Sequence, residues 1–88
     1  MRKVTNVHIG GVNYKNKTIY TTTVFPSVQS VIRQLNVWLF DHLHAKKEEM
    51  KQLPPLDDWS WSDEDASMWY IKYPSDDYLI WTRREPED

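Results

Sequence analysis

One segment of the chain has the periodicity of an amphipathic helix, and its position limits the folds that the rest can adopt. Apolar residues recur there at three- and four-residue spacing: Val28, Val31, Ile32, Leu35, Trp38, Leu39 and Leu43. Such a stripe predicts a helix that buries one face. Pro26 precedes it and Ser27 is placed to cap it, whereas Pro54 and Pro55 must end any continuation. We therefore predict one helix that runs at least to His44.

The segments on both sides of this helix predict β-strands. Residues 4–14 alternate in polarity and residues 18–25 are rich in β-branched side chains, which favours two strands. Polar residues 15–17 between them predict a hairpin turn. After the helix, residues 66–73 and 78–83 predict a second hairpin. The order is ββαββ, an α+β fold in which the helix packs on one face of a small antiparallel sheet.

Two details of the hairpins bear on the fold. Gly10 and Gly11 interrupt the first strand and indicate either a bulge or the turn itself; we favour the bulge, because residues 15–17 already offer a turn. In the second hairpin, a four-residue loop pairs Ile71 with Ile80 on one side and Tyr70 with Trp81 on the other. One helix covers only one side, so the other must meet solvent, a second copy or a partner.

Composition indicates one small intracellular domain. The chain has 88 residues, of which 40% are hydrophobic and 27% charged, and no cysteine. We predict a single domain over residues 1–88, with an acidic loop at about 54–65 and a polar tail at 84–88. Disulfides and cysteine-based zinc sites are excluded. Because no apolar run suits a signal peptide or a membrane span, we expect a cytoplasmic protein without a membrane partner.

The chain divides by charge into two opposite halves, and the acidic half contains a tryptophan-rich segment. Residues 1–53 carry a net +5 and residues 54–88 a net −7. Acids and tryptophans gather in the candidate partner-binding segment: Asp57, Asp58, Trp59, Trp61, Asp63, Glu64 and Asp65. The carboxylates would steer the segment toward a basic protein surface and the tryptophans would anchor it. Alternatively, Trp59 or Trp61 completes the core of a small domain.

The last hairpin offers a second candidate site, on one face of its two strands. That face carries Tyr70, Lys72, Trp81 and Arg83, with Arg84 nearby. Aromatic rings beside cations suit single-stranded nucleic acid, because bases stack on the rings while cations contact the phosphates. The site is open only if the helix packs on the opposite face.

The sequence shows no pattern typical of catalysis, a cofactor or a metal. The two glycines are adjacent, so no phosphate-cradling loop is present, and no serine lies in a nucleophile elbow. Asp41, His44 and Glu48 share one helix face, but we interpret them as solvated, since no further metal ligand is evident. We predict no enzyme activity, no cofactor and no metal site.

The resulting hypothesis is a small protein-binding domain that engages a basic surface of a partner. It would suit an inhibitor or immunity-type protein, such as a phage or mobile element makes to block a nucleic-acid enzyme, an analogy that rests on size and charge. Two alternatives remain open. One is a single-stranded nucleic-acid module that uses the aromatic sheet face, and the other is a structural homo-oligomer, for instance a homodimer, that buries the open face.

Overall fold

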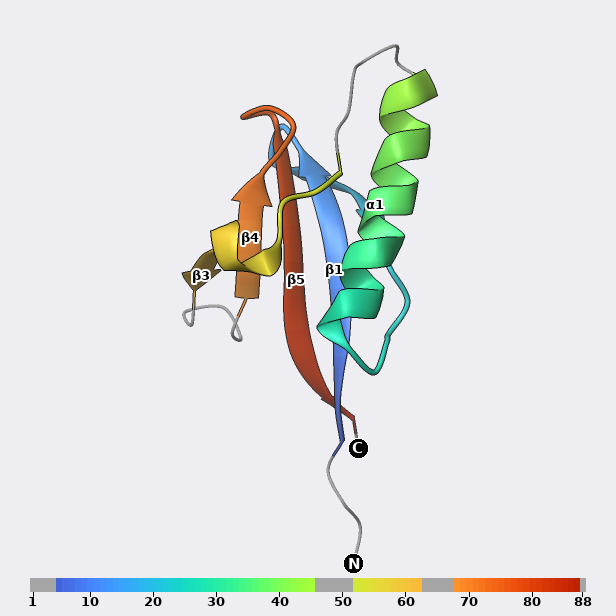
Figure 1. The fold of residues 1–88 in the computed structure, drawn as a ribbon, viewed down its shortest axis with the longest axis vertical. Coiled ribbons are helices and arrows are strands. Elements are labelled where there is room, and N and C mark those ends of the chain that lie inside the picture. The colour runs from blue at the N-terminus through green and yellow to red at the C-terminus, as the bar shows by residue number, and fades with distance from the viewer. Residues whose placement is uncertain (1–4, 46–51, 63–67, 88) are drawn as a thin grey trace, which may run out of the picture.

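The structure is a computed structural model, and it describes residues 5–45, 52–62 and 68–87. The elements follow in the order β1 (Thr5–Tyr14), β2 (Lys17–Thr21), α1 (Val28–Ala45), the 3₁₀ turn η1 (Leu56–Asp58), β3 (Ser60–Ser62), β4 (Met68–Lys72) and β5 (Tyr78–Glu87). The five strands form one antiparallel sheet in the order β2-β1-β5-β4-β3, and α1 packs against it (Figure 1). The predicted α+β class is confirmed.

The sheet is larger than the four strands predicted. Strand β3 lies inside the segment expected to be an acidic loop, and it adds an edge strand beside β4. Strand β5 continues to Glu87 because it pairs with β1 along its whole length, so residues 84–87, expected as a polar tail, belong to the sheet. Strand β2 ends at Thr21, earlier than predicted. The possible helix extension over 46–51 lies outside the described residues.

The glycine pair of β1 is neither a turn nor the site of the bulge. Strand β1 runs straight through it, and β1 pairs with β5 in continuous register on both sides of it. The irregularity in pairing with β2 comes instead between Val12 and Asn13. The first hairpin turns at Lys15 and Asn16, whose φ angles of 51° and 68° fit a two-residue turn with positive φ at both positions. The predicted turn is therefore confirmed, and the favoured bulge at the glycines is wrong.

The predicted pairing of the second hairpin is confirmed, and the structure decides which of its faces the helix covers. Ile71 pairs with Ile80 and Tyr70 with Trp81, as expected. Ile80 is fully buried in the cluster that includes Val31, Leu35, Leu39 and Leu43 of α1. The helix thus covers the face of Ile71 and Ile80, and the face of Tyr70 and Trp81 is turned away from it.

Gly10 sets how closely α1 approaches the sheet. A Cβ atom built on Gly10 would lie 2.5 Å from Val31 Cγ1 and 3.0 Å from Leu35 Cδ1, so the helix occupies the space that a side chain would fill. Ser27 caps the helix start as predicted, because its Oγ accepts a hydrogen bond of 3.3 Å from the Ser30 N–H.

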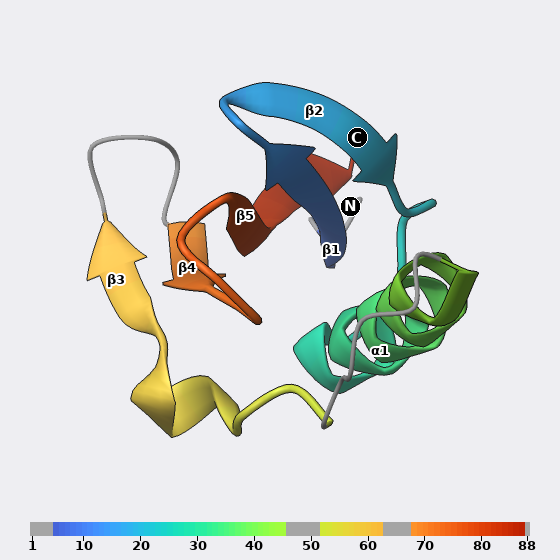
Figure 2. The same ribbon diagram turned by 90° about the horizontal axis from the view of Figure 1, so that it is seen from above.

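Residues 52–58 lie on the same side of the sheet as the helix. Figure 2 shows α1 and the segment through η1 side by side beneath the strands, with η1 below β4 and β3. The Leu53 N–H donates to Asn36 Oδ1 at 2.8 Å, which ties this segment to the helix. Leu53 and Trp59 then join the buried cluster. The segment therefore completes a core that one helix leaves open on the β4 side.

Candidate functional site

The structure divides the acidic tryptophan segment into parts with different roles. Asp57 and Asp58 lie in η1, and both are exposed. Trp59 is only 5% exposed, and its Nε1–H donates to the Pro54 carbonyl oxygen at 3.0 Å. It is therefore part of the core, and it holds the segment to the domain rather than offering its ring to a partner. The remaining predicted residues, Asp63, Glu64 and Asp65, lie outside the described residues.

Trp61 differs from Trp59 although both belong to the same short segment. It is 48% exposed and lies on the edge strand β3, directly opposite Trp69 of β4. The two ring centroids are 4.5 Å apart with 58° between the planes. This tilted contact fixes one face of the exposed indole. Of the two predicted tryptophan anchors, Trp61 is thus the one that a partner can reach.

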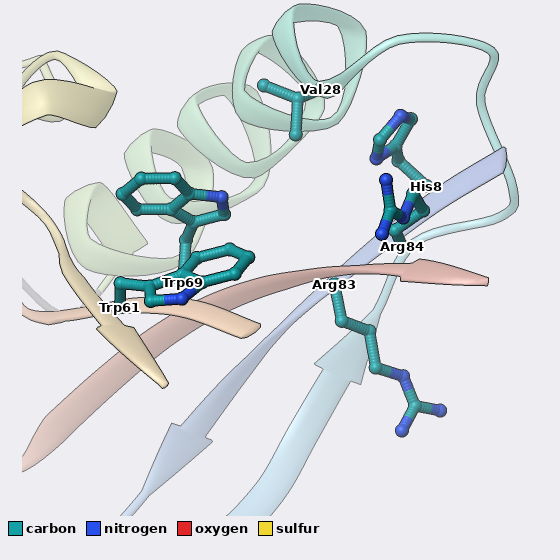
Figure 3. A pocket seen from close by; sticks show the side chains of 6 residues that line it. All are labelled: His8, Val28, Trp61, Trp69, Arg83 and Arg84. Atoms are coloured by element: carbon teal, nitrogen blue, oxygen red, sulfur yellow. The ribbon is translucent and has the colours of Figure 1, made fainter. Parts of the chain in front are cut away.

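A pocket of about 330 Å³ opens beside the tryptophan pair. It lies on the helix side of the sheet, and its lining comes from β1, the first turn of α1, β3, β4 and β5: His8, Val28, Trp61, Trp69, Arg83 and Arg84. In Figure 3, His8 and Arg84 stand together on one side and the two tryptophans on the other, while the Arg83 guanidinium points to the opposite face of the sheet. Arg84 is therefore the arginine whose charge faces the pocket.

Strand register explains why His8 and Arg84 are neighbours. His8 of β1 pairs with Arg84 of β5, two residues along from the row in which Gly10, Thr82 and Trp69 lie opposite one another. His8 is further held by two backbone hydrogen bonds of 2.8 Å with Phe25, just before the helix. Strands β1 and β5 thus meet the residues that precede α1 and form this corner of the molecule.

Two basic side chains, His8 and Arg84, lie together in the pocket, and their closeness affects the charge of His8. The pKa of His8 lies below its ordinary value of 6.5, first because partial burial disfavours the charged imidazole and second because the Arg84 guanidinium repels it. None of the six lining residues carries a carboxylate. The described pocket therefore combines an aromatic wall with a positive one.

Sequence reasoning did not bring His8 and Trp69 into any site. From the sequence, Arg84 is only a neighbour of the aromatic sheet face. The grouping depends on the pairing of the first strand with the last, and these strands are separated by most of the chain. The alternation within a strand predicts which of its residues share a face, but it does not predict which other strand pairs with that strand.

The second predicted site lies on the sheet face turned away from the helix. Arg83 lies over the ring of Trp81, with 5.6 Å from the guanidinium carbon to the centroid. The Trp81 Nε1–H donates to Asn13 Oδ1 at 3.1 Å. Tyr70 pairs with Trp81 across the strands, while Lys72 lies exposed nearer the hairpin turn. The four predicted residues are therefore on one face, as expected, and it is the face that α1 leaves uncovered.

At the turn end of this face is a second pocket of mixed charge. Its volume is about 380 Å³ and its lining is Asn13, Lys15, Asn16, Lys72, Asp76, Asp77 and Leu79. Its two lysines and two aspartates carry equal and opposite formal charges, so it has no strong preference for a charged ligand.

The described part of the chain holds neither a metal-binding cluster nor a helix that could span a membrane. Over residues 5–45, 52–62 and 68–87, no three histidine, aspartate or glutamate side chains gather as a metal site would require. Of the helix-face residues considered above, Glu48 lies outside those ranges. No helix within them combines the length and the hydropathy needed to cross a membrane. Comparison with protein-family models, with curated proteins and with solved structures found no match.

Proposed function

We propose that this chain is a protein-binding domain of the inhibitor or immunity type, acting in the cytoplasm, which engages a basic surface of its partner through the edge strand β3. The observation that carries the proposal is Trp61, which is 48% exposed and braced on Trp69. A large ring that is already fixed loses little entropy on binding, and tryptophan is enriched among the residues that dominate interface energies. The protein works by binding rather than by catalysis.

The acids that precede Trp61 in the chain would set the sign of the partner's charge, whereas Arg84 and His8 lie across the pocket from Trp61. Asp57 and Asp58 are exposed in η1, which leads directly into β3, and the half of the chain from residue 54 onward carries a net −7. An acidic segment of this kind attracts a partner rich in lysine or arginine and accelerates its association at low salt. In this proposal Trp61 contributes most of the binding affinity, while the acids orient the partner and raise the association rate.

The test uses Trp61→Ala, with Phe40→Ala as the matched control. Phe40 is 56% exposed and belongs to α1 rather than to β3, so its substitution also removes an exposed ring. A protein captured by the wild-type chain should bind Trp61→Ala about 30-fold more weakly, as expected for a hot-spot residue, and should bind the control unchanged. Equal binding by both variants, or capture of no protein from the natural host, would contradict the proposal.

A second candidate function rests on the uncovered sheet face. Because α1 packs on the opposite side, Tyr70, Trp81 and Arg83 are placed where single-stranded nucleic acid could stack. Loss of oligonucleotide binding in Trp81→Ala, together with full binding by Trp61→Ala, would favour this function over protein recognition. A homodimer through the same face predicts instead that light scattering reports a mass that falls on dilution.

A further inference from the structure

The pocket beside the tryptophan pair is built for a ligand of two parts. One wall consists of Trp61 and Trp69, whose rings are tilted by 58° and close the pocket on the side of β3 and β4. Val28 adds an apolar contact from the first turn of α1. The indole faces offer a surface on which a planar ring stacks.

The facing wall is positive. Arg84 and His8 stand together across from the tryptophans (Figure 3), and no carboxylate among the lining residues offsets the Arg84 charge. Partial burial and then the Arg84 guanidinium both disfavour the charged form of His8, so Arg84 supplies the positive charge of this wall. A phosphate group has several acceptor oxygens and close to two negative charges, so it pairs with a guanidinium and accepts a hydrogen bond from an imidazole at the same time.

We propose that this pocket binds a nucleotide, with the base against Trp61 and Trp69 and the phosphate against Arg84 and His8. The volume of about 330 Å³ lies in the range of small-ligand sites. The ligand is either a free nucleoside monophosphate or the 5′-terminal nucleotide of a single strand, since both present a base and a phosphomonoester. This site goes beyond the proposed protein contact, with which it shares Trp61 alone.

The experiment is a titration of the full chain with adenosine monophosphate, followed by calorimetry and by the indole N–H signals of Trp61 and Trp69 in NMR. Adenosine and inorganic phosphate serve as probes of the two halves. We expect each half to bind at least about tenfold more weakly than the whole nucleotide, because each uses one wall. The signals of both indoles should shift, whereas that of Trp81, on the other face, should stay unchanged.

Two substitutions with matched controls locate the site. Arg84→Gln should weaken nucleotide binding at least about tenfold through loss of a charge-assisted contact, and Trp61→Leu should do the same through loss of stacking. Arg33→Gln on the exposed face of α1 and Phe40→Leu are the controls, and both should bind as the wild type does. Circular dichroism of every variant verifies that the fold is retained.

The source of the nucleotide is decided by comparing adenosine monophosphate with oligonucleotides that carry a 5′-phosphate or a 5′-hydroxyl. Tighter binding of the 5′-phosphorylated strand than of the monophosphate assigns the site to strand ends, and the reverse assigns it to free nucleotides. The proposal is overturned if none of these probes binds, if inorganic phosphate binds as tightly as the nucleotide, or if Arg84→Gln and Trp61→Leu bind like their controls.

A result that rules out the nucleotide site can be told apart from one that rules out the proposed protein contact. Arg84→Gln should lose the nucleotide but still capture the partner protein. Replacing Asp57 and Asp58 with asparagine should slow partner association, because steering depends on charge, while leaving nucleotide affinity unchanged.

Discussion

Gly10 lies where α1 packs directly on the sheet, and replacing it with alanine tests this packing. The new methyl carbon would lie 2.5 Å from Val31 Cγ1, 3.0 Å from Leu35 Cδ1 and 3.0 Å from the Trp81 carbonyl oxygen. Ordinary carbon contacts are about 3.5 to 4.0 Å. Val31 and Leu35 are both fully buried, so the helix must shift or the side chains must leave their preferred rotamers.

The expected cost follows from two opposing effects. Overpacking a buried site costs about 1 to 3 kcal/mol, and removing a glycine from a strand regains about 0.5 to 1 kcal/mol. We expect Gly10→Ala to lower the free energy of unfolding by about 1 to 2 kcal/mol. In a domain of this size that corresponds to a Tm lowered by about 5 to 15 °C. Thermal unfolding followed by circular dichroism measures it.

Val31→Ala supplies the matched variant, because it removes the atom that the new methyl would meet. Alone it should cost about 2 kcal/mol for the lost burial and the cavity. In the double variant the methyl introduced by Gly10→Ala enters the space left by Val31, so the combined cost should fall short of the sum by at least about 1 kcal/mol. Strictly additive costs, or an unchanged Tm in Gly10→Ala, would refute the close approach of the helix to Gly10.

Three further predictions concern other contacts. Trp59→Phe should cost about 1 to 3 kcal/mol, because the Pro54 carbonyl oxygen loses its donor, whereas Trp61→Phe should change stability by less than about 0.5 kcal/mol; equal urea midpoints for the two would contradict this. Ser27→Ala should lower the free energy of unfolding by about 1 kcal/mol, because the helix loses its cap, whereas Ser27→Asp should keep most of the capping stabilisation; denaturant unfolding measures both. The pKa of His8 in the folded protein is lowered by burial and by Arg84, which faces it in the pocket. The stability that comes from keeping His8 neutral should therefore be complete above about pH 6.5 and should be lost as the pH falls through the folded pKa. His8→Gln should flatten this part of the plot of unfolding free energy against pH, and an unchanged slope would refute the assignment.

Local pattern was sufficient for the elements that depend on neighbours in the chain. The helix stripe with its serine cap, the turn at residues 15–17 and the register of the last hairpin each follow from a short segment, and the structure confirms all three. Strand β3 was missed because three residues of alternating serine and tryptophan pair only when β4 is already beside them. The bulge was misplaced because glycine also marks close packing, which is its role at Gly10.

The candidate site shows the same division between local and distant information. The sequence by itself determined that Trp61 lies in an acidic segment and that Tyr70 and Trp81 share a face, since adjacent charges and the two-residue period of a strand are local properties. Only the tertiary structure decided that Trp59 is core, that α1 covers the face of Ile80, and that His8 meets Arg84. These results depend on the pairing of β1 with β5, which joins the two ends of the chain, and such pairing is set by the packing of the whole domain rather than by either strand alone.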